Sequence, residues 1–167
     1  MGRAAQIWLF AMPGARDIAV AHEALALLGI ASLAACDFSA LSGGQRQLVL
    51  IARALASECQ TLMLDEPMAA LDVKHQAQVL QLLQHLAQSR QLCILFTTHD
   101  PCHALTIAQR ALLLMEHQQY LYGDCDAVVT EENVTRLYGI PVKAICVAAQ
   151  PQPYRALIPL FTLTESP

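Results

Sequence analysis

The sequence has 167 residues, of which 55% are hydrophobic and 14% charged, and its formal net charge is −4. A chain of this length can bury a sizeable core, and this composition excludes a globally disordered protein. The acidic balance and the lack of a basic tract argue against nucleic-acid binding. No apolar run reaches the roughly 18 residues of a membrane span. Six cysteines without a C-x-x-C pair are typical of reduced thiols in a cytoplasmic protein.

Helical and strand patterns alternate along the chain, after residues 1–16, which are predicted to be irregular. In chain order, the patterns predict a helix over 17–28 that ends at Gly29, a helix over 42–57, a strand over 61–64, a helix over 73–90, a strand over 92–98, a helix that starts at 100, strands over 111–115 and 119–122, and a helix over 131–138. The proline-rich tail after Cys146 is expected to be extended. This order predicts an α/β domain with a mostly parallel sheet.

The second predicted helix opens with Ser42, Gly43, Gly44 and Gln45. A structural interpretation is a capping box, in which Ser42 is the N-cap and Gln45 reaches back to the cap amide. A functional interpretation uses the same geometry, because backbone N–H groups left uncovered at two glycines form a phosphate site at a helix N-terminus.

Polar residues also follow the two apolar strands. Asp65 and Glu66 come after the strand over 61–64, and His99 follows the strand over 92–98. A surface ion pair and a structural histidine would explain them without function. However, the carboxyl ends of parallel strands are where α/β sheets bind ligands. There Asp65 can hold Mg²⁺, Glu66 can polarise an attacking water, and His99 can contact a phosphate oxygen.

Taken together, these motifs and their order resemble the ATP-binding subunits of ABC transporters. The segments that carry the resemblance are 41–56, 62–67, 70–72 and 97–100. Two short flanks, Gly2-Arg3 and the segment 137–142, look like those of the importers for iron-siderophores, haem, cobalamin and molybdate.

The resemblance implies a fold and a division of the chain. It implies a partial P-loop NTPase (RecA-like) ATPase domain with the end of the family's helical subdomain. Residues 1–40 would be the remnant of that subdomain, 41–146 the signature helix with the C-terminal part of the ATPase core, and 147–167 an extended tail.

The resemblance also implies a role for each motif residue. Ser42, Gly43, Gly44 and Gln45 match the signature motif, and Asp72 matches the D-loop aspartate, so these five would contact ATP. Asp65 would hold Mg²⁺, Glu66 would be the catalytic glutamate, and His99 the switch histidine.

The implied partners are a second ATP-binding subunit, arranged head to tail, and transmembrane permease subunits. The implied location is peripheral, at the cytoplasmic face of the inner membrane. In this family a phosphate loop G-x-x-x-x-G-K-[ST] precedes the segment at Gly2-Arg3, and no such motif occurs in the 167 residues. An N-terminally truncated subunit is therefore expected, inactive on its own.

Three hypotheses about activity follow. The first is the C-terminal portion of an importer ATPase, which couples ATP hydrolysis to uptake of a metal chelate or an oxyanion. The second is a non-catalytic truncated subunit or remnant that contributes only its signature motif to a partner's ATP site. The third is a metal-dependent hydrolase built on His99, Cys102 and His103.

Overall fold

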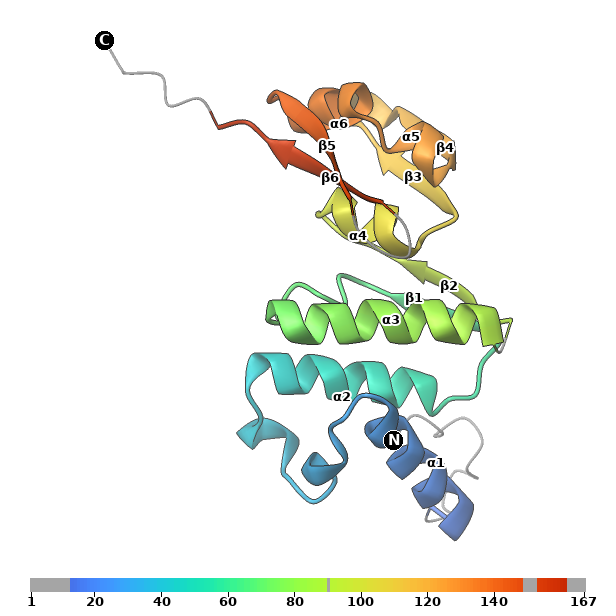
Figure 1. Cartoon of the computed structure of the whole chain (residues 1–167). Coiled ribbons are helices and arrows are strands. Elements are labelled where there is room, and N and C mark those ends of the chain that lie inside the picture. The colour runs from blue at the N-terminus through green and yellow to red at the C-terminus, as the bar shows by residue number, and fades with distance from the viewer. Residues whose placement is uncertain (1–12, 90, 149–152, 162–167) are drawn as a thin grey trace. The chain divides into compact units, whose positions relative to one another are not determined.

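The computed structural model describes residues 13–89, 91–148 and 153–161 (Figure 1). The chain divides into two compact units, Met1–Thr98 and His99–Pro167. Each unit has its own helices, paired strands and buried side chains, and each is described by itself.

The first unit follows the predicted order of helices and strands. Its described elements are α1 (Ala15–Leu27), the 3-10 helices η2 (Ala31–Leu33) and η3 (Phe38–Ala40), α2 (Gly43–Leu55), β1 (Thr61–Leu64), α3 (Val73–Ser89) and β2 (Cys93–Phe96). The predicted ends of the helices and strands agree with these bounds to within two residues. Of the start that was predicted to be irregular, residues 1–12 lie outside the described residues, and α1 begins at Ala15.

The core of the first unit lies on one face of a parallel strand pair. β1 pairs with β2 in the register Leu62↔Ile94 and Met63↔Leu95. α2 contacts β1 and α3 contacts β2. Leu62 is buried, as are the apolar faces of both helices, whereas Met63 is 71% exposed and Leu95 56% exposed. One face of the pair is therefore covered, and the other presents apolar side chains.

The second unit combines short helices with two hairpins. Its elements are α4 (Pro101–Ile107), β3 (Arg110–Leu114), η4 (Glu116–Gln118), β4 (Tyr120–Asp124), α5 (Cys125–Val128), α6 (Glu131–Tyr138), β5 (Val142–Val147) and β6 (Tyr154–Pro159). β3 pairs with β4 and β5 with β6, both antiparallel. Buried side chains from the helices and strands of this unit form one core cluster, made of Cys125, Val129, Val134, Val142 and Leu157.

Two glycines end helices in the left-handed conformation that glycine adopts without strain. Gly29 follows α1 with a φ of +69°, as the sequence predicts. Gly139 follows α6 with a φ of +68°, and its N–H donates to the Thr135 carbonyl at 2.9 Å. The sharp turn at Gly139 leaves Tyr138 as the last residue of α6.

The α/β fold class is confirmed, and the details of strand pairing differ from the prediction. Parallel pairing holds for β1 and β2, while the other described pairs are antiparallel. The described part of the tail over Tyr154–Pro159 is extended, as predicted, and the unpredicted feature is that it pairs with β5 as a strand in which Leu157 is only 4% exposed. The division at residues 40 and 146 stays a prediction.

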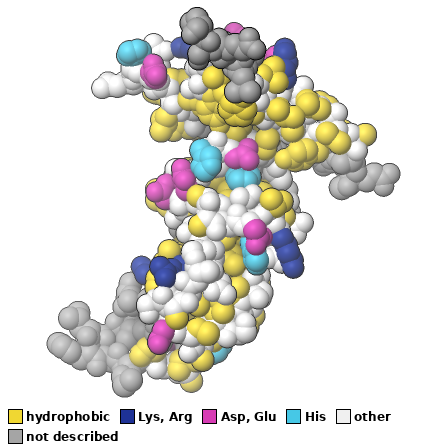
Figure 2. Space-filling model, turned by 90° about the vertical axis from the view of Figure 1, so that its left-hand side faces the viewer, with side chains coloured by type: hydrophobic (Ala, Val, Ile, Leu, Met, Phe, Trp, Pro, Cys, Tyr) yellow, Lys and Arg dark blue, Asp and Glu magenta, His cyan; other side chains and the backbone are white. Residues whose placement is uncertain are grey.

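Apolar side chains are prominent at the surface of the second unit, as the yellow area in the upper part of Figure 2 shows. One face of the β3–β4 hairpin carries Leu112, Leu114, Tyr120 and Tyr122, all more than half exposed. Among the described residues, no helix combines the length and the apolar character needed to cross a membrane.

Candidate functional site

The glycine-rich segment forms the first turn of α2. Ser42 Oγ accepts a hydrogen bond from the Gln45 N–H at 3.3 Å, and Gln45 Oε1 accepts one from the Ser42 N–H at 3.0 Å. The predicted capping box is thus present. A helix leaves its first N–H groups without intrahelical partners, and the box satisfies those of Ser42 and Gln45. The N–H groups of Gly43 and Gly44 then point out of a helix N-terminus, where an anion is stabilised.

The two glycines differ in their surroundings. A Cβ atom on Gly43 would have nothing within 4 Å, so this position is open to a ligand. A Cβ atom on Gly44 would lie 3.1 Å from the Ala70 carbonyl oxygen, so the helix packs against the backbone of the loop between β1 and α3. Gln47, one turn further along α2, donates from Nε2 to the Glu66 carbonyl at 3.5 Å. The start of α2 and this loop therefore form one packed arrangement.

Asp65 and Glu66 follow the last residue of β1 and share a hydrogen-bond partner in Thr97. The Thr97 hydroxyl donates to Asp65 Oδ1 at 2.6 Å, and Thr97 Oγ1 also accepts a hydrogen bond from the Glu66 N–H at 2.9 Å. Thr97 comes directly after β2, so the parallel register places it beside Asp65. One threonine thus orients one carboxylate and fixes the backbone that carries the other.

Glu66 has a φ of +41°, which is unusual for a residue with a side chain. This left-handed conformation costs about 1–2 kcal/mol and persists only where the surroundings enforce it. Here the Glu66 N–H is bonded to Thr97, and its carbonyl accepts from the Ala69 N–H at 3.2 Å. The chain therefore changes direction sharply between the two carboxylates, and the buried Pro67 follows at once.

Asp72 begins α3. Its Oδ1 accepts a hydrogen bond from the His75 backbone N–H at 2.9 Å, and both carboxylate oxygens lie 2.8 Å from His75 Nδ1. These hydrogen bonds from His75 hold the pKa of Asp72 below its ordinary value. The structural function of Asp72 is thus to cap α3, and its side chain is still 66% exposed.

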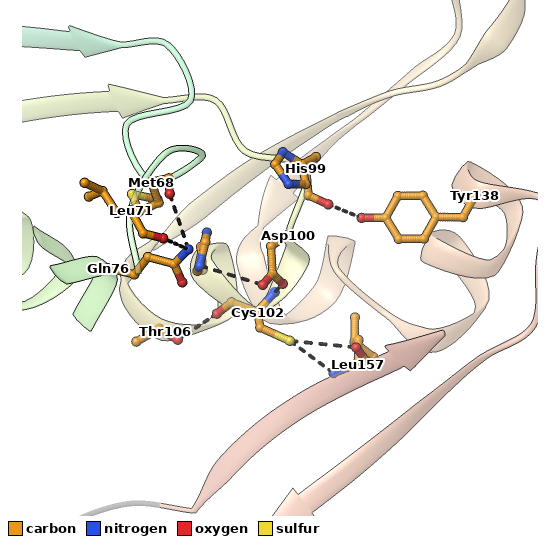
Figure 3. A network of polar contacts seen from close by, with 10 residues as sticks. Met68, Leu71, Gln76, His99, Asp100, Cys102, Thr106, Tyr138 and Leu157 are labelled. Atoms are coloured by element: carbon orange, nitrogen blue, oxygen red, sulfur yellow. Dashed lines mark hydrogen bonds and ion pairs between the residues drawn. The ribbon is translucent and has the colours of Figure 1, made fainter. Parts of the chain in front are cut away.

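His99 is the first residue of the second unit and precedes α4. Asp100 is the N-cap of α4, as predicted, and its Oδ1 accepts from the Cys102 N–H at 2.8 Å. The Tyr138 hydroxyl, at the end of α6, donates to the His99 carbonyl (Figure 3). The backbone around His99 is therefore held from both sides within this unit.

The side chains that would build a hydrolase metal site have other partners. His103 Nε2 lies 3.7 Å from Asp100 Oδ2, and Cys102 Sγ accepts from the Leu157 N–H at 3.4 Å. Burial raises the pKa of the Cys102 thiol, which disfavours the thiolate that binds metals. Within residues 13–89, 91–148 and 153–161, no three His, Cys, Asp or Glu side chains are grouped so that they could hold a metal ion. The hydrolase hypothesis gains no support.

The first unit brings most of the predicted site residues to two neighbouring segments. The segments are the start of α2 and the loop that runs from Asp65 to Asp72, which touch at Gly44 and Gln47. His99 belongs to the other unit. Thr97 is a residue that the sequence analysis missed, although aligning the ends of two parallel strands would have placed it beside Asp65. The catalytic and binding roles of all these residues stay predictions.

The Asp65 carboxylate and the N-terminus of α2 have the chemistry needed for the expected cofactors, Mg²⁺ and ATP. Mg²⁺ prefers carboxylate oxygens, and Asp65 presents an exposed carboxylate oriented by a hydroxyl. ATP phosphates are bound by backbone N–H groups at helix N-termini, and α2 presents two such groups at glycines.

Comparison with known proteins supports the resemblance to ABC transporter ATP-binding subunits. The ABC transporter family matches residues 8–69. The molybdate import ATP-binding protein of Haemophilus influenzae is 47% identical over 142 residues, which are 85% of this chain and 56% of that protein. A solved metal-chelate type ABC transporter in an inward-facing conformation is 43% identical, with a TM-score of 0.88 over 96% of this chain and 64% of its own.

A more distant solved structure is the ATP-binding cassette MJ0796, dimeric and bound to ADP and Pi. It is 33% identical, with a TM-score of 0.57 over 63% of this chain and 45% of its own. The chain spans little more than half the length of the curated relatives it matches. These similarities agree with the motifs and with the fold, and the chain belongs to the family of ABC transporter ATP-binding proteins.

Proposed function

We propose that this chain is the C-terminal portion of the ATP-binding subunit of an ABC importer, which couples ATP binding and hydrolysis to uptake of a metal chelate or an oxyanion. The observation that carries the proposal is the start of α2, where a capping box leaves the N–H groups of two glycines at an open helix N-terminus. The substrate class is supported by the molybdate and metal-chelate systems among the similar proteins.

In this proposal the segment 42–45 contacts the phosphates of an ATP that a second subunit holds. The N–H groups of Gly43 and Gly44 and the helix dipole of α2 would stabilise phosphate charge. Ser42 and Gln45 keep this turn in shape through their mutual hydrogen bonds. A dimeric cassette among the similar structures supports an arrangement of two subunits, here head to tail.

The loop after β1 supplies the residues that act on the attacking water. Asp65 would hold Mg²⁺, whose charge, when it is bound, stabilises the phosphate oxygens during transfer. Glu66 is exposed at the surface of the first unit and would orient and polarise a water molecule. Thr97 keeps Asp65 and the Glu66 backbone in place, so these two roles depend on one hydroxyl.

His99 and Asp72 complete the proposed set. His99 would contact the terminal phosphate oxygen and so report which nucleotide is bound. Asp72, which precedes α3, would face the nucleotide of the partner subunit with its side chain, which is 66% exposed. Permease subunits would receive the resulting movement, with the subunit peripheral at the cytoplasmic face of the membrane.

The proposal is tested with a fused subunit, in which this chain is joined to the part of the Haemophilus influenzae relative that it does not match. By the family resemblance, that part carries the phosphate loop. We expect the fused subunit to hydrolyse ATP, Glu66→Gln to remove turnover, and Glu132→Gln, at an exposed glutamate of α6, to leave it unchanged. The 167-residue chain alone should not hydrolyse ATP, with or without Glu66→Gln.

Other results would change the conclusion. Turnover by the isolated chain that Glu66→Gln abolishes would contradict the shared-site proposal. A fused subunit that binds ATP without hydrolysing it, yet activates a partner whose own signature serine has been changed, would favour the non-catalytic alternative.

A further inference from the structure

We propose that Tyr138 is a positioning residue for His99, which fixes the backbone from which the histidine side chain projects. The inference rests on the proposed function, because the importance of the His99 orientation depends on contact with a nucleotide. It assigns a specific function to a tyrosine at the end of α6, far from His99 in the sequence.

The contact is a hydrogen bond from the Tyr138 hydroxyl to the His99 carbonyl oxygen (Figure 3). The Tyr138 ring is half-buried and packs against the core cluster of the second unit, so the hydroxyl has a defined position. Burial raises the pKa of Tyr138, with a smaller effect of the Asp100 charge, so the hydroxyl keeps its proton and remains a donor.

The backbone after His99 is fixed independently. The Asp100 carboxylate caps α4, and Cys102 Sγ is bonded to the backbone of Leu157 in β6. The helix that follows His99 is therefore attached to the core of the second unit. The peptide between His99 and Asp100 precedes this attached helix, and its carbonyl is the group that accepts from the Tyr138 hydroxyl.

The hydrogen bond from Tyr138 restricts the orientation of the His99 side chain. A peptide with its carbonyl held at one end and a capped helix at the other has few accessible φ and ψ values. The Cα–Cβ direction of His99 is then restricted before any nucleotide binds, which lowers the entropy lost when the ring engages a phosphate. Without the hydroxyl, the ring of residue 138 can still pack, but the His99 peptide gains freedom.

A suitable variant removes the Tyr138 hydroxyl and keeps the ring, so that its positioning effect is measured separately from its packing. Tyr138→Phe keeps the ring in the core and removes only the donor. The matched control is Tyr120→Phe, which removes the hydroxyl from a tyrosine that is 67% exposed on the β3–β4 hairpin. His99→Ala gives the size of the full loss.

The first measurement is hydrogen exchange of residues 98–103 in the full chain. Tyr138→Phe should speed exchange there about two- to tenfold, the range that one hydrogen bond allows, and leave β3 and β4 unchanged. Equal exchange in the wild-type chain, Tyr138→Phe and Tyr120→Phe would overturn the inference.

The second measurement is ATP turnover of the fused subunit. Tyr138→Phe should lower kcat about two- to tenfold with an unchanged KM for ATP and an unchanged melting temperature, a smaller version of the His99→Ala effect. A lower melting temperature with unchanged kcat would show that Tyr138 is only a packing residue and overturn the inference. If the wild-type fused subunit shows no turnover, the proposed function fails, and hydrogen exchange decides separately whether Tyr138 holds the His99 peptide.

Discussion

Two adjacent glycines at the start of α2 are expected to respond oppositely to the same substitution. Gly43→Ala adds a methyl group with nothing within 4 Å. Gly44→Ala places the same methyl group 3.1 Å from the Ala70 carbonyl oxygen, closer than ordinary contact. The pair is internally controlled, because both positions lie in the same helical turn and gain the same atom.

The expected magnitudes follow from two competing effects. Replacing glycine by alanine in a helix stabilises it by about 0.5–1 kcal/mol, which is the result expected for Gly43→Ala. At Gly44 the backbone of the loop must move to make room, and such overpacking costs about 1–3 kcal/mol. The net effect at Gly44 is therefore destabilising, and it loosens the contact between α2 and the loop that carries Glu66.

Hydrogen exchange of residues 45–55 measures this difference within the full chain. After subtraction of the helix gain, the net cost at Gly44 is about 0.5–2 kcal/mol, which corresponds to exchange about 2- to 30-fold faster in Gly44→Ala than in the wild type. Gly43→Ala should exchange no faster than the wild type, yet lower turnover of the fused subunit, because its methyl group occupies the space proposed for phosphate. Equal protection of α2 in both variants would refute the packing argument at Ala70.

Three further predictions concern other described contacts. Thr97→Val removes the hydroxyl bonded to Asp65 and should lower the Mg²⁺ affinity or turnover of the fused subunit about 10- to 100-fold. Thr61→Val, at the other end of β1, is the control and should lower neither. The hydrogen bond from Lys143 lowers the pKa of Glu131 from its ordinary 4.5, so at neutral pH the wild type should protect α6 from hydrogen exchange more than Glu131→Gln does. This difference in protection should vanish as the pH falls through the lowered pKa, because Glu131 is then protonated. A difference that persists in acid would contradict this. The chain should self-associate through the exposed face of β1 and β2, and Met63→Lys combined with Leu95→Glu should suppress the association seen by sedimentation, whereas a monodisperse wild-type chain would count against this.

The sequence predicts the first unit better than the second. Its helices have a clear apolar period, and its strands lie between glycine, proline and polar residues, so local signals define both type and ends. The β5–β6 hairpin was missed because its strands are separated by a proline-containing segment and because burial of Leu157 depends on contacts with distant residues. Pairing of this kind is decided by tertiary packing rather than by local propensity.

In the candidate site, too, local features are predicted from the sequence and contacts between distant segments are not. The capping box at Ser42 and Gln45 is a local pattern, and both of its hydrogen bonds are present. The bond from Thr97 to Asp65 follows only once the parallel register of β1 and β2 is aligned. The close approach of Gly44 to Ala70 depends on tertiary packing, so composition and spacing do not reveal it. The positive φ of Glu66 is likewise enforced by its neighbours and not by its residue type.

In the proposed dimer, the segment 42–45 of one subunit completes a site whose carboxylates belong to the other. The most direct test mixes two inactive forms of the fused subunit, Ser42→Arg and Glu66→Gln. In a head-to-tail dimer of the two, one site keeps Glu66 from one subunit and Ser42 from the other, so we expect mixing to restore up to about a quarter of wild-type turnover. Turnover that stays at the level of the separate variants, although they form mixed dimers, would contradict it.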